Sequence, residues 1–192
     1  MASDDLPELA FPSAQAWETW LVEHADDSSG AWLKLAKKGC PTPSVTYAEA
    51  VRGALRFGWV DSKRVGLDEQ WFLQRVTRRG PRSPWSAINR EAAERLMADG
   101  LMEPAGLAAV QAAKENGRWD SAYAGQRTAT VPDDLRAALD AVPAAAENFA
   151  TLSSVNRYAV LYRVQDAKKP ETRARRIERF VQMLARGETL HP

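Results

Sequence analysis

The sequence has few of the side chains on which most catalytic and metal sites depend. It contains one cysteine, Cys40, and two histidines, His24 and His191. A lone cysteine excludes an intramolecular disulfide and a multi-cysteine zinc site. We expect His24 on the apolar face of a helix and His191 in a short C-terminal tail, which leaves no histidine for a triad or a metal centre. The sequence therefore predicts no catalytic residue, no metal ion and no cofactor.

Long hydrophobic runs and an overall charge are also missing. No stretch approaches the roughly 18 consecutive apolar residues of a membrane span. The first residues, Met1 to Asp5, lack the basic and apolar regions of a signal peptide, so we expect a cytoplasmic protein without membrane insertion. The formal net charge of +1 gives no overall attraction to nucleic acid. Phosphate-loop and serine-nucleophile motifs are absent as well.

Tryptophan, in contrast, is plentiful. All seven tryptophans precede residue 120: Trp17, Trp20, Trp32, Trp59, Trp71, Trp85 and Trp119. A Trp-rich first part and an Ala-rich second part predict two kinds of packing within one continuous fold. We expect a flexible N-terminus at 1–12, a Trp-rich α+β part at 13–130, a helical part at 131–187 packed on the same core, and a tail at 188–192.

Periodicity and turn residues predict the elements. A helix follows Ser13, a strand covers 31–37, a second helix follows a capping box formed by Thr46 and Glu49, and a β-hairpin pairs 59–63 with 71–78. After Ser86 the pattern is helical, with helix starts at Pro104, Pro132, Pro143 and Pro170 and a long loop at 118–130. The predicted fold class is α+β and mainly helical. It has a small antiparallel sheet of about three strands, packed with an N-terminal helix pair and a C-terminal helical bundle.

Basic residues gather in two places. Residues 63–90 contain Lys63, Arg64, Arg75, Arg78, Arg79, Arg82 and Arg90, and residues 157–179 contain Arg157, Arg163, Lys168, Lys169, Arg173, Arg175, Arg176 and Arg179. Such clusters favour anionic partners, and Trp71 and Trp85 could stack on a base or sugar. The competing interpretation is a solvated face in which the charges pair with nearby carboxylates.

Two arginines of the last helix share a face with its apolar side chains. Helical spacing places Arg173 and Arg176 on the side of Ile177 and Phe180. A guanidinium turned inward must be paired or must face a ligand, since burying it alone costs several kcal/mol. Asp61 is one candidate partner. A protein carboxylate as the partner would make the arrangement structural, whereas a bound phosphate or carboxylate would make it a site.

Several strings resemble one family. Residues 48–50 (AEA) and 56–62 (RFGWVDS) are similar to the "sY.EA...ALcFGWIDs" signature of the YdeI/OmpD-associated, bacteriocin-protection family. Residues 83–90 (SPWSAINR) resemble its "S.WS..N" segment, and residues 100–107 resemble its "G.M...G" turn. Residues 167–177 (AKKPETRARRI) resemble its "AK..eTR.rRi" end. The similarity runs from about Trp17 to Gly187, with departures at Arg56, where the family often has cysteine, and at residues 76–80 (VTRRG), where it tends toward an "F.PRr" string.

The resemblance implies a role in protection against bacteriocins or antimicrobial peptides but supplies no reaction. Our leading hypothesis is a non-catalytic protein that holds an anionic small molecule or peptide between the hairpin and the C-terminal helices. The predicted ligand-binding residues are Trp59, Asp61, Lys63, Arg79, Trp85, Asn89, Arg157, Thr172, Arg173 and Arg176. One alternative is nucleic-acid binding through Arg75, Arg78, Arg79, Arg82 and Arg90. Another is an enzyme with Asp61 as general base.

Overall fold

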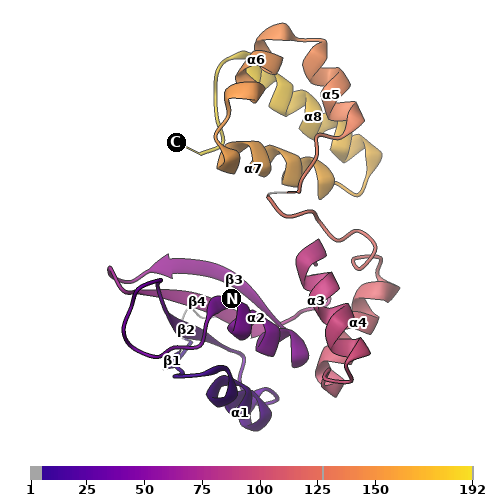
Figure 1. Ribbon diagram of the computed structural model, residues 1–192. Coiled ribbons are helices and arrows are strands. Elements are labelled where there is room, and N and C mark those ends of the chain that lie inside the picture. The colour runs from indigo at the N-terminus through magenta and orange to yellow at the C-terminus, as the bar shows by residue number, and fades with distance from the viewer. Residues whose placement is uncertain (1–5, 127, 192) are drawn as a thin grey trace. The chain divides into compact units, whose positions relative to one another are not determined.

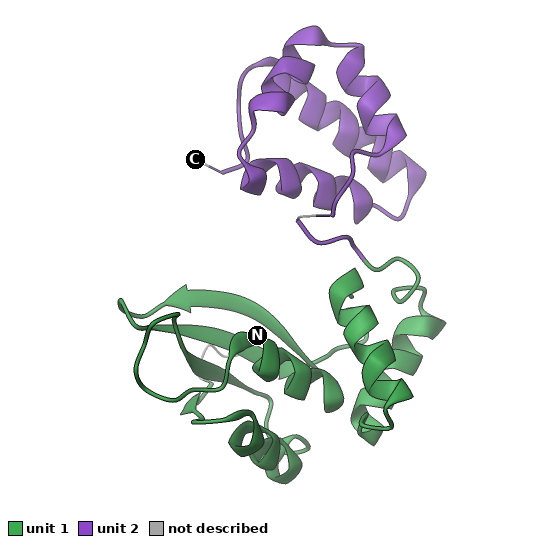
Figure 2. Ribbon diagram, in the orientation of Figure 1, with its two compact units in different colours: residues 1–122 green, residues 123–192 purple. Residues whose placement is uncertain are grey.

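The structure, a computed structural model, describes residues 6–126 and 128–191. The expectations for residues 1–5, for residue 127 and for residue 192 lie outside the described residues. The chain divides into two compact units, residues 1–122 and 123–192 (Figure 2). The division comes eight residues before the expected boundary at residue 130, because the segment 118–130 belongs partly to each unit. Each cluster of buried side chains lies within one unit, and the expected packing of both parts on one core stays a prediction.

Unit 1 combines a sheet with helices, and unit 2 is helical (Figure 1). The elements of unit 1 are β1 (Glu8–Ala10), α1 (Ala14–His24), β2 (Gly30–Ala36), α2 (Tyr47–Arg56), β3 (Trp59–Gly66), β4 (Trp71–Arg78), α3 (Ala87–Ala98) and α4 (Pro104–Glu115). Those of unit 2 are α5 (Asp133–Asp140), α6 (Pro143–Thr151), α7 (Ser154–Gln165) and α8 (Pro170–Ala185). The predicted α+β, mainly helical fold is confirmed. None of the described helices is long and apolar enough to cross a bilayer.

The sheet has one strand more than expected. Its four strands run in the order β1-β2-β4-β3, with β2–β4 and β4–β3 antiparallel and β1 parallel to β2. The prediction of about three antiparallel strands missed β1, which is parallel to β2 and lies within the expected N-terminal segment 1–12. β1 is only three residues long, too short to show the alternation by which a strand is recognised. The predicted hairpin is confirmed, with a β-bulge between Asp61 and Arg64.

One face of the sheet packs on α1 and α2. Strand alternation turns Leu33 of β2 and Val76 of β4 to this face, where they are fully buried with Trp17 of α1. The Trp17 indole donates a hydrogen bond of 3.1 Å to the carbonyl oxygen of Ala50 in α2. Because a buried indole N–H needs an acceptor, this bond fixes α1 against α2. The capping box of Thr46 and Glu49 starts α2, as predicted.

A second cluster joins α2 to α3 and α4. It contains Leu55 of α2, Leu96 of α3, Val110 of α4 and the two indoles of Trp85 and Trp119. α4 can approach the end of α2 closely because two glycines leave room. A β-carbon on Gly58 (φ +70°) would meet the Ala105 carbonyl oxygen at 2.6 Å, and one on Gly106 would meet the carbonyl oxygen of Arg56.

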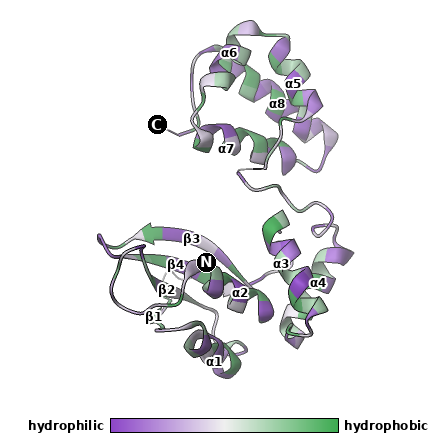
Figure 3. Ribbon diagram, viewed as in Figure 1, coloured by the Kyte–Doolittle hydropathy of each residue, from purple (hydrophilic) through white to green (hydrophobic). Residues whose placement is uncertain are grey.

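Unit 2 packs its four named helices around their own apolar side chains. Leu135, Phe149, Val164 and Leu184 come from α5, α6, α7 and α8 respectively, and all are buried. The ribbon of this unit alternates between hydrophobic and hydrophilic positions, as amphipathic helices do (Figure 3). Proline stands in the first turn of α6 and of α8, as predicted, since its missing N–H and fixed φ suit a helix start.

Candidate functional site

A cavity of about 340 Å³ in unit 1 brings together three of the predicted site residues, Trp59, Arg79 and Trp85. It lies where β3 begins and β4 ends, and α4 forms the opposite wall. The lining consists of Ala25, Asp26, Phe57, Gly58, Trp59, Arg78, Arg79, Gly80, Pro81, Ser83, Trp85, Ala105, Ala108, Ala109, Ala112 and Ala113. We refer to it as the Arg79 cavity.

Backbone geometry brings these side chains to the cavity. Gly58, in the left-handed region, ends the turn after α2, so Trp59 enters β3 beside the last residue of β4. The N–H of Arg79 then donates a hydrogen bond of 2.9 Å to the carbonyl oxygen of Gly58, which places the Arg79 side chain next to the Trp59 strand. Trp85 is buried just before α3, where its ring meets that of Trp119 edge-on at 4.8 Å.

The Arg79 guanidinium lies over the Trp85 ring. Its central carbon is 3.8 Å from the centroid of the Trp85 ring, and its Nη1 donates a hydrogen bond of 2.8 Å to the carbonyl oxygen of Pro84. A cation over an indole is attracted by the ring, by about 0.5–2 kcal/mol. Among the described residues, Arg78, Arg79 and the carboxylate of Asp26 line the cavity. The site thus combines guanidinium groups with aromatic and alanine side chains.

Other predicted residues of unit 1 lie outside this lining. The Tyr47 hydroxyl donates a hydrogen bond of 2.7 Å to Oδ2 of Asp61. Lys63 is exposed at the bulge of β3, and Asn89 lies in the first turn of α3, where its N–H donates to Oγ of Ser86. The structure places none of these three in the Arg79 cavity. Asp61 as a general base stays a prediction.

The basic residues of 75–90 do not form one surface. Arg78 and Arg79 line the Arg79 cavity, Arg90 lies 3.7 Å from the Glu94 carboxylate, and Arg82 is exposed. Arg75 alternates with the core-facing residues of β4 and therefore points to the other face of the sheet. These arginines are close in sequence but lie on different surfaces, because successive side chains of a strand point to opposite faces of the sheet.

The two arginines of α8 are paired within unit 2. Nε and Nη2 of Arg173 donate hydrogen bonds of 2.6 and 2.8 Å to the two carboxylate oxygens of Asp134 in α5, and Nη1 donates to the carbonyl oxygen of Val164. Arg176 donates to the carbonyl oxygen of Arg163 and, at 3.3 Å, to the Asp166 carboxylate. The partner of Arg173 is therefore Asp134 and not Asp61, which favours the structural interpretation.

The ion pair shifts the pKa values of both of its members. The hydrogen bond from Arg173 holds the pKa of the Asp134 carboxyl below its usual value, and the same bond raises the pKa of Arg173. The remaining predicted residues of unit 2 are Arg157 and Thr172. Arg157 lies over the Phe149 ring at 4.5 Å, and Thr172 is half-buried in the first turn of α8.

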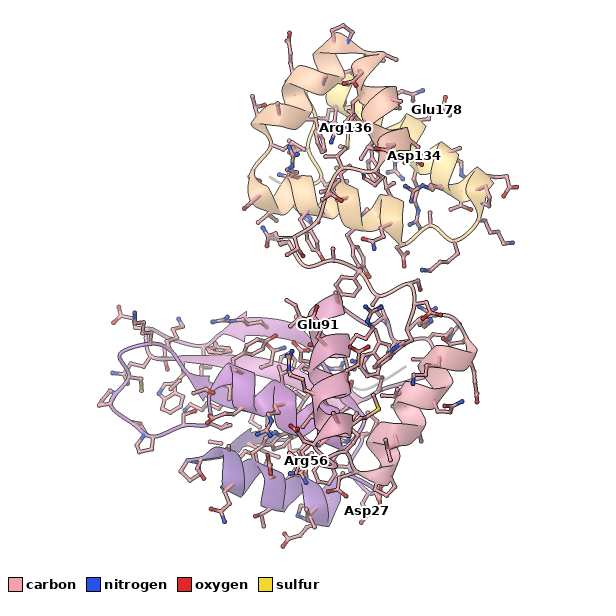
Figure 4. All side chains as sticks on the ribbon, turned by 45° about the vertical axis from the view of Figure 1, so that its right-hand side comes forward. Asp27, Arg56, Glu91, Asp134, Arg136 and Glu178 are labelled. Carbon is pink, nitrogen blue, oxygen red and sulfur yellow. The ribbon has the colours of Figure 1, made fainter. Side chains whose placement is uncertain are left out.

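Two further hollows were not predicted. A shallow groove of about 1100 Å³ in unit 2 runs between α5 and α8, lined by Ala138, Val142, Ile177 and Val181 with charged residues at its rim, among them Asp134 and Glu178 (Figure 4). A hollow of about 480 Å³ in unit 1 is lined by Lys37, Lys38, Cys40, Ser44 and Arg64 with neighbouring residues. Residues from separate segments form both hollows, so local sequence patterns do not predict them.

Comparison with known families divides the chain in the same way as the structure. Residues 9–109 match the family model described as a domain of unknown function (DUF8412). Residues 128–187 match the model described as bacteriocin-protection, YdeI or OmpD-associated. The second match confirms the resemblance for unit 2, whereas the first covers much of unit 1 by a separate model. No curated protein and no solved structure matches the chain.

Proposed function

We propose that unit 1 of this chain, which belongs over residues 9–109 to the family described as a domain of unknown function (DUF8412), is a binding domain for a small anionic molecule. A segment that matches the YdeI/OmpD-associated model follows it at residues 128–187. The ligand occupies the Arg79 cavity without being chemically changed. Its anionic group is a carboxylate or phosphate, and it carries a compact apolar or aromatic part. The observation that carries the proposal is the Arg79 guanidinium, held on Trp85 at the edge of a cavity with apolar walls.

Electrostatics supports an anion. Arg78 and Arg79 line the cavity, and a guanidinium can donate hydrogen bonds to the oxygens of a carboxylate or phosphate. Arg79 is already oriented by the Trp85 ring and by Pro84, so little side-chain freedom is lost on binding. A guanidinium binds carboxylate and phosphate oxygens through parallel N–H groups, which gives directional as well as electrostatic recognition.

Size and apolar walls define the rest of the ligand. A volume of about 340 Å³ lies at the lower end of the usual range for small-molecule pockets. Trp59, Trp85 and the alanines of α4 offer flat or small apolar surface. Such walls exclude water around the ion pair and strengthen it. Phenyl phosphate and benzoate have the matching combination of a ring and an anionic group and are suitable probes.

Isothermal titration of the full chain with phenyl phosphate, benzoate and inorganic phosphate tests the proposal. Wild type is expected to bind at least one ring-bearing probe more tightly than inorganic phosphate. Arg79→Gln removes a charged hydrogen-bond donor and is expected to raise the Kd by about 10-fold or more. Arg52→Gln, an exposed arginine of α2, is the matched control and should leave the Kd unchanged.

Arg79→Lys keeps the charge but lacks the planar fork, so an intermediate Kd is expected. Thermal unfolding of each variant checks that the fold is retained. Equal binding by wild type and Arg79→Gln, or no binding of any probe by wild type at millimolar concentration, would refute the proposal.

The role of this binding in the cell is a further part of the proposal. The family matched by unit 2 is described as bacteriocin-protection, and we propose that the bound anion serves such a stress response. Deleting the gene and restoring it with wild type or with Arg79→Gln would test the link. Equal survival of both restored strains under bacteriocin or antimicrobial-peptide stress would contradict it.

A further inference from the structure

The sheet of unit 1 has a second face that carries two tryptophans and two cations. Strand alternation turns this face away from the buried cluster, and cross-strand pairing places Trp32 opposite Arg75, Lys34 opposite Leu73, and Ala36 opposite Trp71. Val60, Ser62 and Val65 of β3 continue the face on one side, and Glu8 and Ala10 of β1 continue it on the other. We call it the open face.

No described helix buries this face. The cluster that packs the sheet on α1 and α2 contains Leu33, Phe72 and Val76 but none of the open-face side chains. In Figure 1 α2 lies over one side of the sheet, which is the side of this cluster. Trp32 and Trp71 remain half-buried, and only Leu73 between them is buried, with 9% of its surface exposed. Their indole rings are therefore partly accessible to a ligand.

The charges on the open face are positive at its centre. Nζ of Lys34 lies 4.8 Å from the centroid of the Trp71 ring. Nη1 of Arg75 lies 3.5 Å from Oγ of Ser62, and Arg75 is the cross-strand partner of Trp32. Among the described strand residues of this face, the carboxylate of Glu8 lies at the edge, in the outer strand. Cations interleaved with accessible indoles are the chemistry that recognises a chain of phosphates and bases.

From this arrangement we infer that the open face binds single-stranded nucleic acid. Bases stack on Trp32 and Trp71, and phosphates lie over Lys34 and Arg75. The two indoles are four residues apart along the pair of strands, a separation of about 13 Å at 3.3 Å per residue. They therefore meet two separate bases of one strand, with Lys34 between them. A duplex keeps its bases stacked inside, so it cannot use these rings.

Charge favours this occupant over a protein partner. A protein partner could pack apolar side chains on the indoles and meet the two central cations with carboxylates, but it would have to supply these two kinds of group from separate residues. A single strand uses the rings and the cations together, since each nucleotide brings one base and one negative charge. The open face lies on the opposite side of the sheet from the buried cluster. The four residues proposed to contact the strand, which are Trp32, Lys34, Trp71 and Arg75, do not line the Arg79 cavity. Variants can therefore separate the two activities.

Fluorescence anisotropy of short labelled oligothymidylate and oligouridylate with the full chain tests the inference. At low ionic strength wild type is expected to bind a single strand and to bind a duplex of equal length at least about tenfold more weakly. Trp32→Ala and Trp71→Ala should each raise the Kd about fivefold or more, because a base loses its stacking partner. Trp71→Phe, which keeps a ring, should recover part of this loss.

Salt dependence tests the two cations separately. Two phosphate contacts predict a slope of about −1.4 for the logarithm of the association constant against the logarithm of the salt concentration. Lys34→Gln and Arg75→Gln should each reduce its magnitude to about 0.7. The control is Lys114→Gln, which also removes an ammonium over an indole, 5.6 Å from the Trp119 ring, but from α4. It should leave both Kd and slope unchanged.

Circular dichroism and thermal unfolding establish that each variant is folded, and Lys34→Gln and Arg75→Gln keep the test meaningful if a tryptophan variant unfolds. Absence of single-strand binding by wild type at low ionic strength would overturn the inference. So would equal affinity for duplex, or affinity that survives loss of both indoles, since phosphate attraction alone would then explain binding. Capture of a protein by the open face, with no oligonucleotide bound, would also overturn it.

Discussion

Arg173 and Asp134 form an ion pair with two hydrogen bonds that joins α8 to α5 across 39 residues of sequence. A third bond from Arg173 satisfies the carbonyl oxygen of Val164 near the end of α7. One guanidinium thus links three helices of unit 2. Its position on the apolar stripe of α8 is explained by these contacts, without any ligand.

Removal of this link is expected to destabilise unit 2. Arg173→Gln should lower the free energy of unfolding by about 1–2 kcal/mol, because a two-bonded ion pair and a bond to a helix end are lost together. Hydrogen exchange of amides in α5 and α8 measures the change in unit 2 directly. Arg179→Gln, an exposed arginine of the same helix, is the control with an expected change below about 0.5 kcal/mol. Equal exchange in both variants would contradict the structural role of Arg173.

The same pair predicts a dependence on pH. The folded-state pKa of Asp134 is depressed by the hydrogen bond from Arg173. Its stabilising contribution is therefore complete above the ordinary aspartate pKa of about 3.9 and is lost as the pH falls through the folded-state value. Asp134→Asn should be less stable than wild type at neutral pH, and the difference should shrink in acid below that ordinary value. A difference that stays constant down to acid pH would show that the charge of Asp134 does not matter.

Tyr158 is expected to ionise at a higher pH than an ordinary tyrosine. Burial, with Tyr123 and Tyr162 close by, raises the pKa of Tyr158 to about 12. Folding thus favours the neutral phenol, so this contribution to stability is complete below the ordinary tyrosine pKa of about 10. It is lost as the pH rises toward about 12. A spectrophotometric titration of wild type minus Tyr158→Phe should show ionisation near the upper value. A step near the ordinary tyrosine pKa would contradict the burial of this hydroxyl.

The close contact of α2 and α4 predicts a strong effect of a single methyl group. A β-carbon at Gly106 would overlap the carbonyl oxygen of Arg56 and lie 3.0 Å from Sδ of Met102. Gly106→Ala should therefore destabilise unit 1 by about 1–3 kcal/mol in denaturant unfolding. Gly66→Ala is the matched control, since a β-carbon there would have no atom within 4 Å. A loss of stability confined to Gly66→Ala would contradict the described packing.

Arg56 joins three parts of unit 1. Its guanidinium donates hydrogen bonds of 2.5 Å to Glu18 in α1, 2.9 Å to Glu103 and 2.9 Å to the carbonyl oxygen of Leu101. Arg56 is labelled in Figure 4. Arg56→Cys should lower the stability of unit 1 by about 2–3 kcal/mol, because it leaves the two carboxylates without their shared cation. Denaturant unfolding beside Arg52→Gln of the same helix measures the effect. An unchanged midpoint would mean that solvent replaces these bonds without cost.

Local signals in the sequence determined where most elements begin and end. Thr46 and Glu49 satisfy each other's backbone N–H within one turn, and Pro143 and Pro170 stand in the first turns of their helices. Each of these signals depends on residues a few positions apart, so it acts in any fold. β1 escaped prediction because three residues contain too little pattern, and its pairing with β2 comes from a segment more than twenty residues away.

Tertiary structure alone decided the partners and the cavities. Helical periodicity correctly placed Arg173 toward the apolar side of α8, but the choice of Asp134 over Asp61 depends on how α5 packs against α8. The Arg79 cavity joins the ends of two strands with the flank of α4, and the open face exists because the helices that contact the sheet cluster on its other side. Spacing along a chain fixes the face on which a side chain lies, whereas its neighbours depend on the free energy of packing distant segments together.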